Sequence, residues 1–217
     1  IAAGDLDLEV IPRSDKDKLS LSMIGVIETL KGLVAEAEAL TEAAVDGRLE
    51  VRGDADRFHG GYREIILGFN RTLDAVIEPL TVAADYVNHI SKGNMPEKIT
   101  AEYKGDFNDI KNNLNICIDA VSALIEDAGM LAEAAVEGRL AVRADASRHE
   151  GDFAKIIDGV NRTLDSVIGP LNVAAGYIEQ IGRGEIPEKI EEEYKGDFND
   201  IKNSINSCID GLGGLVE

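Results

Sequence analysis

The side chains that most often carry out chemistry in proteins are few and scattered in this sequence. There are three histidines and two cysteines among 217 residues. His59, His89 and His149 do not recur at equivalent repeat positions and have no second ligand nearby, so we expect exposed histidines in or beside connecting segments. Cys117 and Cys208 stand alone on predicted helices. We expect two small buried thiols there, and neither a metal site nor a disulfide framework.

Other signs of catalysis or ligand binding are also weak. The acidic run Glu191–Glu193 is better explained as a solvated segment than as an acid–base pair. No glycine-rich phosphate loop follows a predicted strand, and no nucleophile has an adjacent base. The net charge of −19 argues against nucleic acid as a partner, and no run of 18 apolar residues is present to insert into a membrane. We therefore predict a protein that is not an enzyme, with no catalytic residue, cofactor or metal.

The most informative pattern is a 91-residue repeat. The segment Tyr103–Asn112 (YKGDFNDIKN) returns unchanged as Tyr194–Asn203. Each copy consists of two unequal halves, which are marked by glycines at intervals of 46, 45 and 46 residues: Gly47, Gly93, Gly138 and Gly184. Gly4 begins an incomplete half-repeat. A period of this size indicates stacked copies of one supersecondary unit.

Between these glycines, apolar residues recur at alternating intervals of three and four. The first such seam consists of Leu19, Met23, Val26, Leu30, Leu33, Ala37, Leu40 and Ala44. This spacing is typical of coiled-coil helices, so we predict an all-α fold whose middle helices have about 31 residues. Glycine after each seam can end a helix, and a carboxylate before the next seam can cap one. The expected helix caps are Asp106, Asp152 and Asp197.

The connectors between seams are too long for an up-and-down bundle. They run from Gly47 to Gly61, Gly93 to Asp106, Gly138 to Asp152 and Gly184 to Asp197, and their lengths alternate between 14 and 13 residues. Thirteen extended residues reach about 43 Å, which is enough to return along half a helix and start the next helix parallel to the first. Two parallel helices leave their seams half covered. We therefore predict a parallel homodimer of four-helix coiled-coil units, stacked end to end through continuous helices.

A helix, a glycine, a connector with two apolar anchors and a parallel second helix together resemble the HAMP domain, the relay module of bacterial chemoreceptors and sensor histidine kinases. Three connectors match its Gly-x-apolar-x-x-x-apolar pattern: Gly4, Leu6 and Val10; Gly93, Met95 and Ile99; Gly184, Ile186 and Ile190. Gly47 with Leu49 and Gly138 with Leu140 match only in part. Their second anchor falls on Gly53 or Ala144, so we expect Val51 and Val142 to substitute.

Two further features bear on the resemblance. Pro79 and Pro170 match the proline that often opens the first HAMP helix, and we expect local kinks there without a break. The Asp-Glu-x-Gly element that often opens the second helix is missing. Asp15–Lys18 replaces it near the N-terminus, and Gly-Asp-Phe or Gly-Gly-Tyr replaces it later. These departures resemble the divergent units of poly-HAMP arrays.

The resemblance implies five units, over residues 1–32, 30–77, 76–122, 121–168 and 167–217, in a fragment of a longer chain. It also implies a non-catalytic relay on the cytoplasmic side of a receptor, linking an upstream sensor to a downstream output domain of the same chain. A chemoreceptor (a methyl-accepting chemotaxis protein) is favoured because the Gly-Asp-Phe-Asn segments resemble its arrays. The alternatives are a sensor histidine kinase, a passive coiled-coil spacer and a small-molecule sensor.

The core positions differ in phase between alternate units. Counted back from Gly47 they lie at −3, −7, −10 and −14, whereas from Gly93 they lie at −3, −6, −10 and −13. We interpret this alternation as two rotational or splay states of one bundle, coupled because neighbouring units share a helix. Sequence drift between two packing solutions is the simpler explanation. Asn70 and Asn161 flank the seams, and the pattern leaves open whether they fix the register or face outward.

Overall fold

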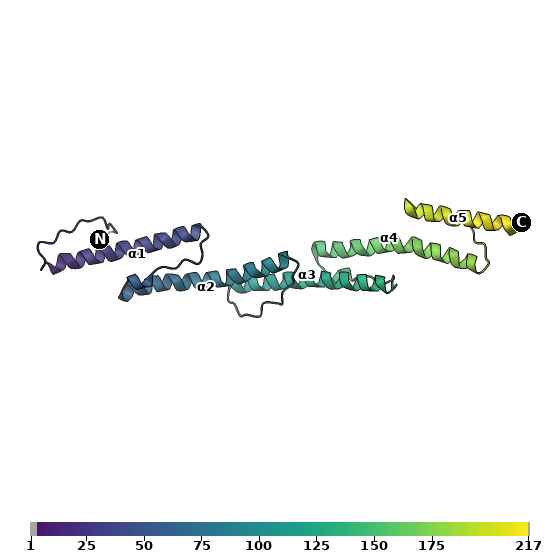
Figure 1. Cartoon of the computed structure of the whole chain (residues 1–217). Coiled ribbons are helices and arrows are strands. Elements are labelled where there is room, and N and C mark those ends of the chain that lie inside the picture. Colours follow the sequence, from purple (N-terminus) through teal and green to yellow (C-terminus); the bar gives the residue numbers. More distant parts are fainter. Residues whose placement is uncertain (1–3, 217) are drawn as a thin grey trace. The chain divides into compact units, whose positions relative to one another are not determined.

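The computed structural model describes residues 4–216, which form five α-helices and two 3-10 turns. The elements are α1 (Lys18–Val45), η1 (Ala55–Arg57), α2 (Gly60–Ser91), α3 (Asp106–Val136), η2 (Ala146–Arg148), α4 (Gly151–Gly182) and α5 (Asp197–Val216) (Figure 1). The described residues contain no strand, which confirms the predicted all-α fold. The three middle helices have 32, 31 and 32 residues, in agreement with the length predicted from the seams.

The chain divides into two compact units, residues 1–114 and 115–217, with the boundary inside α3. The first unit contains α1, α2 and the start of α3. The second contains the rest of α3, α4 and α5. Within each unit the middle helix belongs to two helix pairs, because its first half packs against the preceding helix and its second half against the following one.

The helices of a pair run in the same direction. In the first pair, Leu33 of α1 packs at the level of Ile66 of α2. Further along both helices, Val45 and Leu73 line one groove. In the last pair, Pro170 of α4 lies near Phe198 of α5. The connectors return beside the helices that they leave (Figure 1). The predicted parallel arrangement within the chain is therefore confirmed.

The connectors have two alternating conformations. Residues 46–59, 92–105, 137–150 and 183–196 separate successive helices, and each segment has 14 residues. The predicted one-residue alternation appears between the positive-φ glycines at the two ends of each connector, 47 and 60, 93 and 105, 138 and 151, and 184 and 196, whose spacings are 13, 12, 13 and 12 residues. The helix bounds hide it, because α2 and α4 begin at this second glycine and α3 and α5 begin one residue after it. The alternate connectors also differ by a 3-10 turn, which is present in the first and third.

Glycine ends the helices as predicted. Gly47 has a φ of 75°, and the amide of Arg48 bonds to the Ala43 carbonyl at 2.8 Å. Gly138 repeats this conformation with a φ of 75°, and Arg139 bonds to Ala134 at 2.8 Å. The left-handed residue turns the chain back so that the last free helix carbonyls are bonded.

The internal prolines leave their helices unbroken. α2 continues through Pro79 and α4 through Pro170, so the expected continuity is confirmed, while the expected local kinks stay a prediction. Each proline lies near the next helix of its unit: Pro79 and Phe107 line one small pocket, and Pro170 and Phe198 line another. No described helix is both long and apolar enough to cross a membrane.

Candidate functional site: the connectors and the open seam

The second anchor position of every described connector between helices is buried. Ile99 and Ile190 are 7% and 5% exposed, and the equivalent Ala144 is also 5% exposed. Gly53 is buried at the same place in the first connector. Val51 and Val142 are only half-buried, so the expectation that they replace the second anchor is wrong. The small residues keep the position because it lies directly against a buried isoleucine of the following helix.

That close approach is clearest at Gly53. A Cβ atom placed there would lie 2.9 Å from Cγ2 of Ile66, which is itself fully buried. In the second repeat, Ala144 is accommodated in one cluster with Ile157, the equivalent of Ile66. The connector and the second helix are therefore in contact with no spare volume at Gly53.

An asparagine on the second helix holds the connector backbone at the same position. Asn70 Oδ1 accepts from the amide of Gly53 and its Nδ2 donates to the Gly53 carbonyl, both at 2.9 Å. Asn161 does the same with Ala144 at 3.1 and 2.8 Å, and Asn206 with Ile190 at 2.8 and 3.1 Å. Asn70 and Asn161 therefore do not face outward but bind the connector backbone, and a role in fixing helix register stays a prediction. Sequence reasoning missed Asn206, although it follows the start of α5 at nearly the same distance as Asn70 follows the start of α2.

An arginine adds a second fixed contact in the connectors that carry a 3-10 turn. Arg143 Nε donates to Asp165 Oδ1 at 2.9 Å, and its Nη1 donates to the carbonyls of Leu140 and Val142 at 2.8 and 2.6 Å. Arg52 makes the equivalent bonds to Asp74, Leu49 and Val51. Because the guanidinium bridges a helix carboxylate and two connector carbonyls, it ties the start of the connector to the second helix.

The first anchors lie at the edge of each unit. Leu49, Leu140 and Ile186 are 41–44% exposed, whereas Leu6 and Met95 are half-buried, as is Val10, the second anchor of the N-terminal connector. The helix pair alone covers these side chains incompletely.

The connectors with a 3-10 turn bury one ring each. Phe58 is 6% exposed and packs on Ala55 and Ile66. His149 occupies the equivalent position 91 residues later and is 8% exposed. The expectation of an exposed His149 is wrong, whereas His59 and His89 are exposed as expected. An alignment of the two repeat copies predicts that His149 is buried, since it corresponds to the phenylalanine at position 58.

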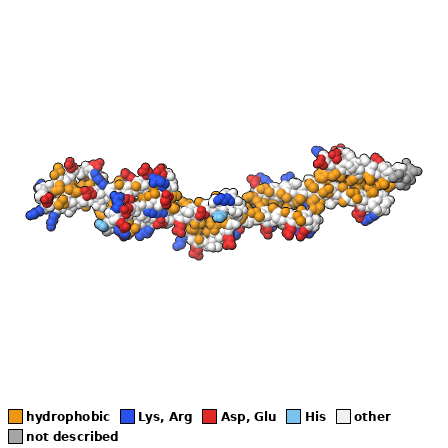
Figure 2. Space-filling model, viewed as in Figure 1, with side chains coloured by type: hydrophobic (Ala, Val, Ile, Leu, Met, Phe, Trp, Pro, Cys, Tyr) orange, Lys and Arg blue, Asp and Glu red, His pale blue; other side chains and the backbone are white. Residues whose placement is uncertain are grey.

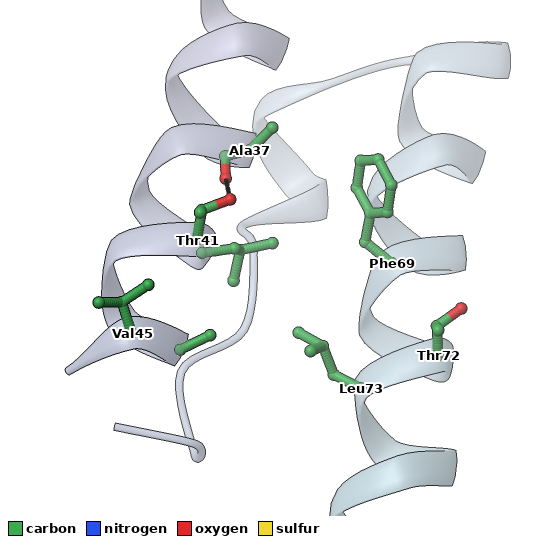
Figure 3. Close-up of a pocket in the computed structure, with 8 residues that line it drawn as sticks. Ala37, Thr41, Val45, Phe69, Thr72 and Leu73 are labelled. Atoms are coloured by element: carbon green, nitrogen blue, oxygen red, sulfur yellow. Dashed lines mark hydrogen bonds between the residues drawn. The ribbon is translucent and has the colours of Figure 1, made fainter. Parts of the chain in front are cut away.

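The seam positions that do not face a connector remain open to solvent. They include a set that is 38–44% exposed: Met23, Phe69, Val76, Leu80, Ile110, Val160, Val167 and Leu171. Val87 and Ile178 are more exposed, at 54% and 63%. Figure 2 shows apolar side chains along the face in view, with charged side chains at their margins. Figure 3 shows one such groove, in which Phe69 and Leu73 of α2 point toward Ala37 and Thr41 of α1.

The cysteines lie on this open face. Cys117 and Cys208 are both exposed free thiols, so the expectation of buried thiols is wrong. The buried residues are their neighbours Ile118 and Ile209, at 4% and 6% exposure. The connector side of the helix buries the isoleucines, and the solvent side carries the thiols. Among the residues described, no cluster of three or more histidine, cysteine or acidic groups could hold a metal ion.

The helix starts differ slightly from the expected caps. Asp106 and Asp197 are the first residues of α3 and α5, and Asp152 is the second residue of α4. Their carboxylates lie in the first turn, where they interact favourably with the positive end of the helix dipole. The cap of α4 is Glu150, whose side chain makes no capping hydrogen bond.

Two other aspartates do cap with their side chains. Asp17 accepts from the Ser20 amide at 3.2 Å and from its hydroxyl at 2.9 Å, and the amide of Arg13 also donates to it. The Arg13 amide, followed by the Ser20 hydroxyl and amide, lowers the pKa of Asp17. In η2, the hydroxyl and amide of Ser147 lower the pKa of Asp145. Asp17 is the member of the Asp15–Lys18 segment that opens α1.

One known protein family matches the sequence of this chain in two places. The family model for the HAMP domain matches residues 57–123 and residues 148–214. The two matches are offset by 91 residues at both ends (148 minus 57 and 214 minus 123), which is the repeat read from the sequence. No solved structure matches the chain.

Proposed function

Because this chain belongs to the HAMP-domain family, we propose that it relays a conformational signal as a parallel homodimer. HAMP domains are non-catalytic signal-relay modules of chemoreceptors and histidine kinases, and they generally act as dimers that link sensor and output domains. In the proposed assembly, each helix pair meets the same pair of a second copy to form a four-helix bundle. The change passes from an upstream sensor to a downstream output domain of the same chain.

The observation that carries the proposal is the open seam. Phe69, Val160 and Leu171 lie on the helix face away from the connector, and each leaves about two fifths of its surface in water. Complete burial of a Leu, Val or Phe side chain contributes about 1.5–3 kcal/mol. A seam of such residues along every helix pair therefore favours association strongly, and its coiled-coil spacing suits a parallel helical partner.

We assign five units to the relay, over residues 1–32, 30–77, 76–122, 121–168 and 167–217. Two types alternate. The units over 30–77 and 121–168 have a 3-10 turn, an arginine bridge and a small second anchor. The others have an isoleucine anchor, such as Ile99 or Ile190, or Val10 at the N-terminus. These differences in connector structure support the interpretation of the phase change as two bundle states. Since α2 and α4 each serve two pairs, a rotation in one pair acts on the next.

A chemoreceptor, with these units on the cytoplasmic side, is the receptor class that we favour. The Gly-Asp-Phe-Asn segments beginning at Gly105 and Gly196 resemble the arrays of that class. A sensor histidine kinase is the alternative, and the identity of the output domain to which the relay is coupled would distinguish the two.

The native cysteines provide a direct test of the homodimer. Cys117 and Cys208 occupy equivalent positions on the open face, 91 residues apart. In a parallel, in-register dimer each thiol faces its own counterpart. A short bifunctional maleimide should link 117 to 117 and 208 to 208, and peptide mapping should show no link between 117 and 208. Sedimentation should give twice the chain mass of 23.3 kDa.

Single variants make the test sharper. C117S and C208S should each still form the cross-link at the remaining cysteine, and the double variant C117S/C208S should form none. When C117S is mixed with C208S and the chains are allowed to exchange, mixed dimers should stay unlinked. Links between 117 and 208, or a stable monomer by sedimentation, would contradict the parallel dimer.

A passive spacer predicts a different response to insertions. Residues inserted into α2 just after Pro79 change the phase between the two pairs that share this helix. A phase-dependent relay should lose coupling to a fused output domain with one or two inserted residues, and a seven-residue insertion should restore much of it. A spacer should tolerate all of these insertions alike.

A further inference from the structure

Asp127 and His149 form a buried polar pair inside the second unit. They are the polar or charged residues that the described part of the chain buries, at 2% and 8% exposure. His149 Nε2 lies 2.6 Å from Asp127 Oδ2, and Arg148 Nη1 donates to the other carboxylate oxygen at 2.9 Å. The pair joins α3 to the end of its connector, just before α4 begins.

The surrounding charges complete this contact. Arg148 Nη2 also donates to Glu126 Oε2 at 3.1 Å, so one guanidinium bridges two neighbouring carboxylates of α3. Asp145, at the start of η2, is the remaining acid close enough to interact with His149 and Arg148. A buried carboxylate is tolerated only when its oxygens are paired, and here each oxygen of Asp127 has its own donor.

The other copy of the repeat fills the same position without a buried carboxylate–histidine contact. The residues 91 positions earlier are Glu36 and Phe58. Glu36 is longer, and its carboxylate accepts from Arg57, the equivalent of Arg148, and from the amide of Asp54, while 12% of its side chain is exposed. Phe58 fills the space with an apolar ring, and its Cε1 would lie 3.3 Å from a Cβ placed on Gly32.

A third position changes together with these two. Ala123 stands where the first copy has Gly32. The larger phenyl ring is thus paired with a residue without a side chain, and the smaller imidazole with a methyl group. The three substitutions form two consistent sets, Gly32–Glu36–Phe58 and Ala123–Asp127–His149, and each set suits its own ring in volume and charge.

We propose that Ala123, Asp127 and His149 form a polar latch that holds the connector of the 121–168 unit. The set Gly32, Glu36 and Phe58 holds the connector of the 30–77 unit, and replacing one residue of either set by its counterpart in the other should weaken the connector, whereas replacing all three should not. Both connectors keep an arginine–carboxylate ion pair, but a hydrogen bond from His149 to Asp127 holds one and the packed ring of Phe58 holds the other, so the two connectors open independently. The latch lies within one chain, so it does not depend on the proposed homodimer.

Hydrogen exchange of the connector amides in the whole chain tests the latch. H149F leaves the carboxylate of Asp127 with one donor fewer in a buried site. We expect amide protection within residues 138–150 to fall about tenfold to a hundredfold, with no change in residues 47–59. The triple variant A123G/D127E/H149F copies the other set and should recover protection to within a few-fold of the parent.

The reverse exchange is the matched control. F58H should lower protection within residues 47–59 alone, and G32A/E36D/F58H should restore it. D127N retains the side-chain shape and should also lower amide protection within residues 138–150. It therefore tests the latch even if H149F disturbs folding. Circular dichroism checks the helix content of each variant. The latch is overturned if H149F and D127N leave protection unchanged, or if the triple variant is as unprotected as H149F.

Discussion

Asn161 binds both backbone hydrogen-bonding groups of Ala144: its Oδ1 accepts from the Ala144 amide at 3.1 Å, and its Nδ2 donates to the Ala144 carbonyl at 2.8 Å. N161A removes both partners from a backbone position whose side chain is buried. A buried polar group left unpaired costs about 1–3 kcal/mol. We expect thermal unfolding at a lower temperature and faster exchange of the Ala144 amide. N172A, on an exposed position of the same helix, should change neither; equal effects of the two substitutions would argue against the backbone contact.

Gly138 and Gly25 should respond oppositely to alanine. Gly138 has a φ of 75°, where a Cβ atom is strained, and G138A should destabilise by about 1–2 kcal/mol. Gly25 lies inside α1 with open space around it, so G25A should stabilise by roughly 0.5–1 kcal/mol. Urea unfolding of both variants measures the difference. A neutral G138A would mean that the helix end can be rebuilt without its left-handed residue.

Gly53 and Ile66 should be coupled. The Cβ of G53A would approach Ile66 Cγ2 to 2.9 Å, and overpacking of this kind costs about 1–3 kcal/mol. I66V alone should cost about 0.5–1.5 kcal/mol. The double variant G53A/I66V should be more stable than the sum of the single effects predicts, because a smaller neighbour gives the new methyl more room. A double-mutant cycle by urea unfolding checks this, and strict additivity would contradict the contact.

Asp17 should make α1 sensitive to acid. Its pKa is lowered in the folded chain by the Arg13 amide and by Ser20, so the ionised carboxylate favours the folded state. This contribution is present above the usual aspartate pKa of 3.8 and is lost as the pH falls through the lower folded value. NMR titration of the Asp17 carboxyl should show the lowered pKa, with a smaller shift in S20A. D17N should remove the Asp17 part of the acid loss of α1 stability, whereas the neighbouring D15N should leave it in place.

The helices and their ends could be predicted because local sequence determines them. The seam spacing from Leu19 to Ala44 and the glycine at 47 are both short-range signals, and α1 ends where they indicate. The connector contacts could not be predicted in the same way. Asn70 meets Gly53 across 17 residues, and no periodicity describes the path between them. The burial of His149 depends on Asp127, 22 residues earlier, and becomes visible only when the two copies are compared.

The exposed cysteines illustrate a different limit. A coiled-coil spacing assigns a residue to an apolar face but does not say whether a connector of the same chain or another chain covers that face. Cys117 and Ile118 are adjacent, yet only Ile118 is covered in the single chain. Cys117 belongs to the seam by its spacing, and because the single chain leaves it exposed, only a second chain could cover it.

The asparagine contact has a consequence for how such a chain can lengthen during evolution. The same amide holds glycine, alanine or isoleucine at positions 53, 144 and 190, because it recognises the peptide group and not the side chain. A newly duplicated segment therefore keeps its connector in place while mutations vary the side chain at this connector position. Internal duplication followed by divergence at one small position can thus generate modules with different cores from a single ancestral plan.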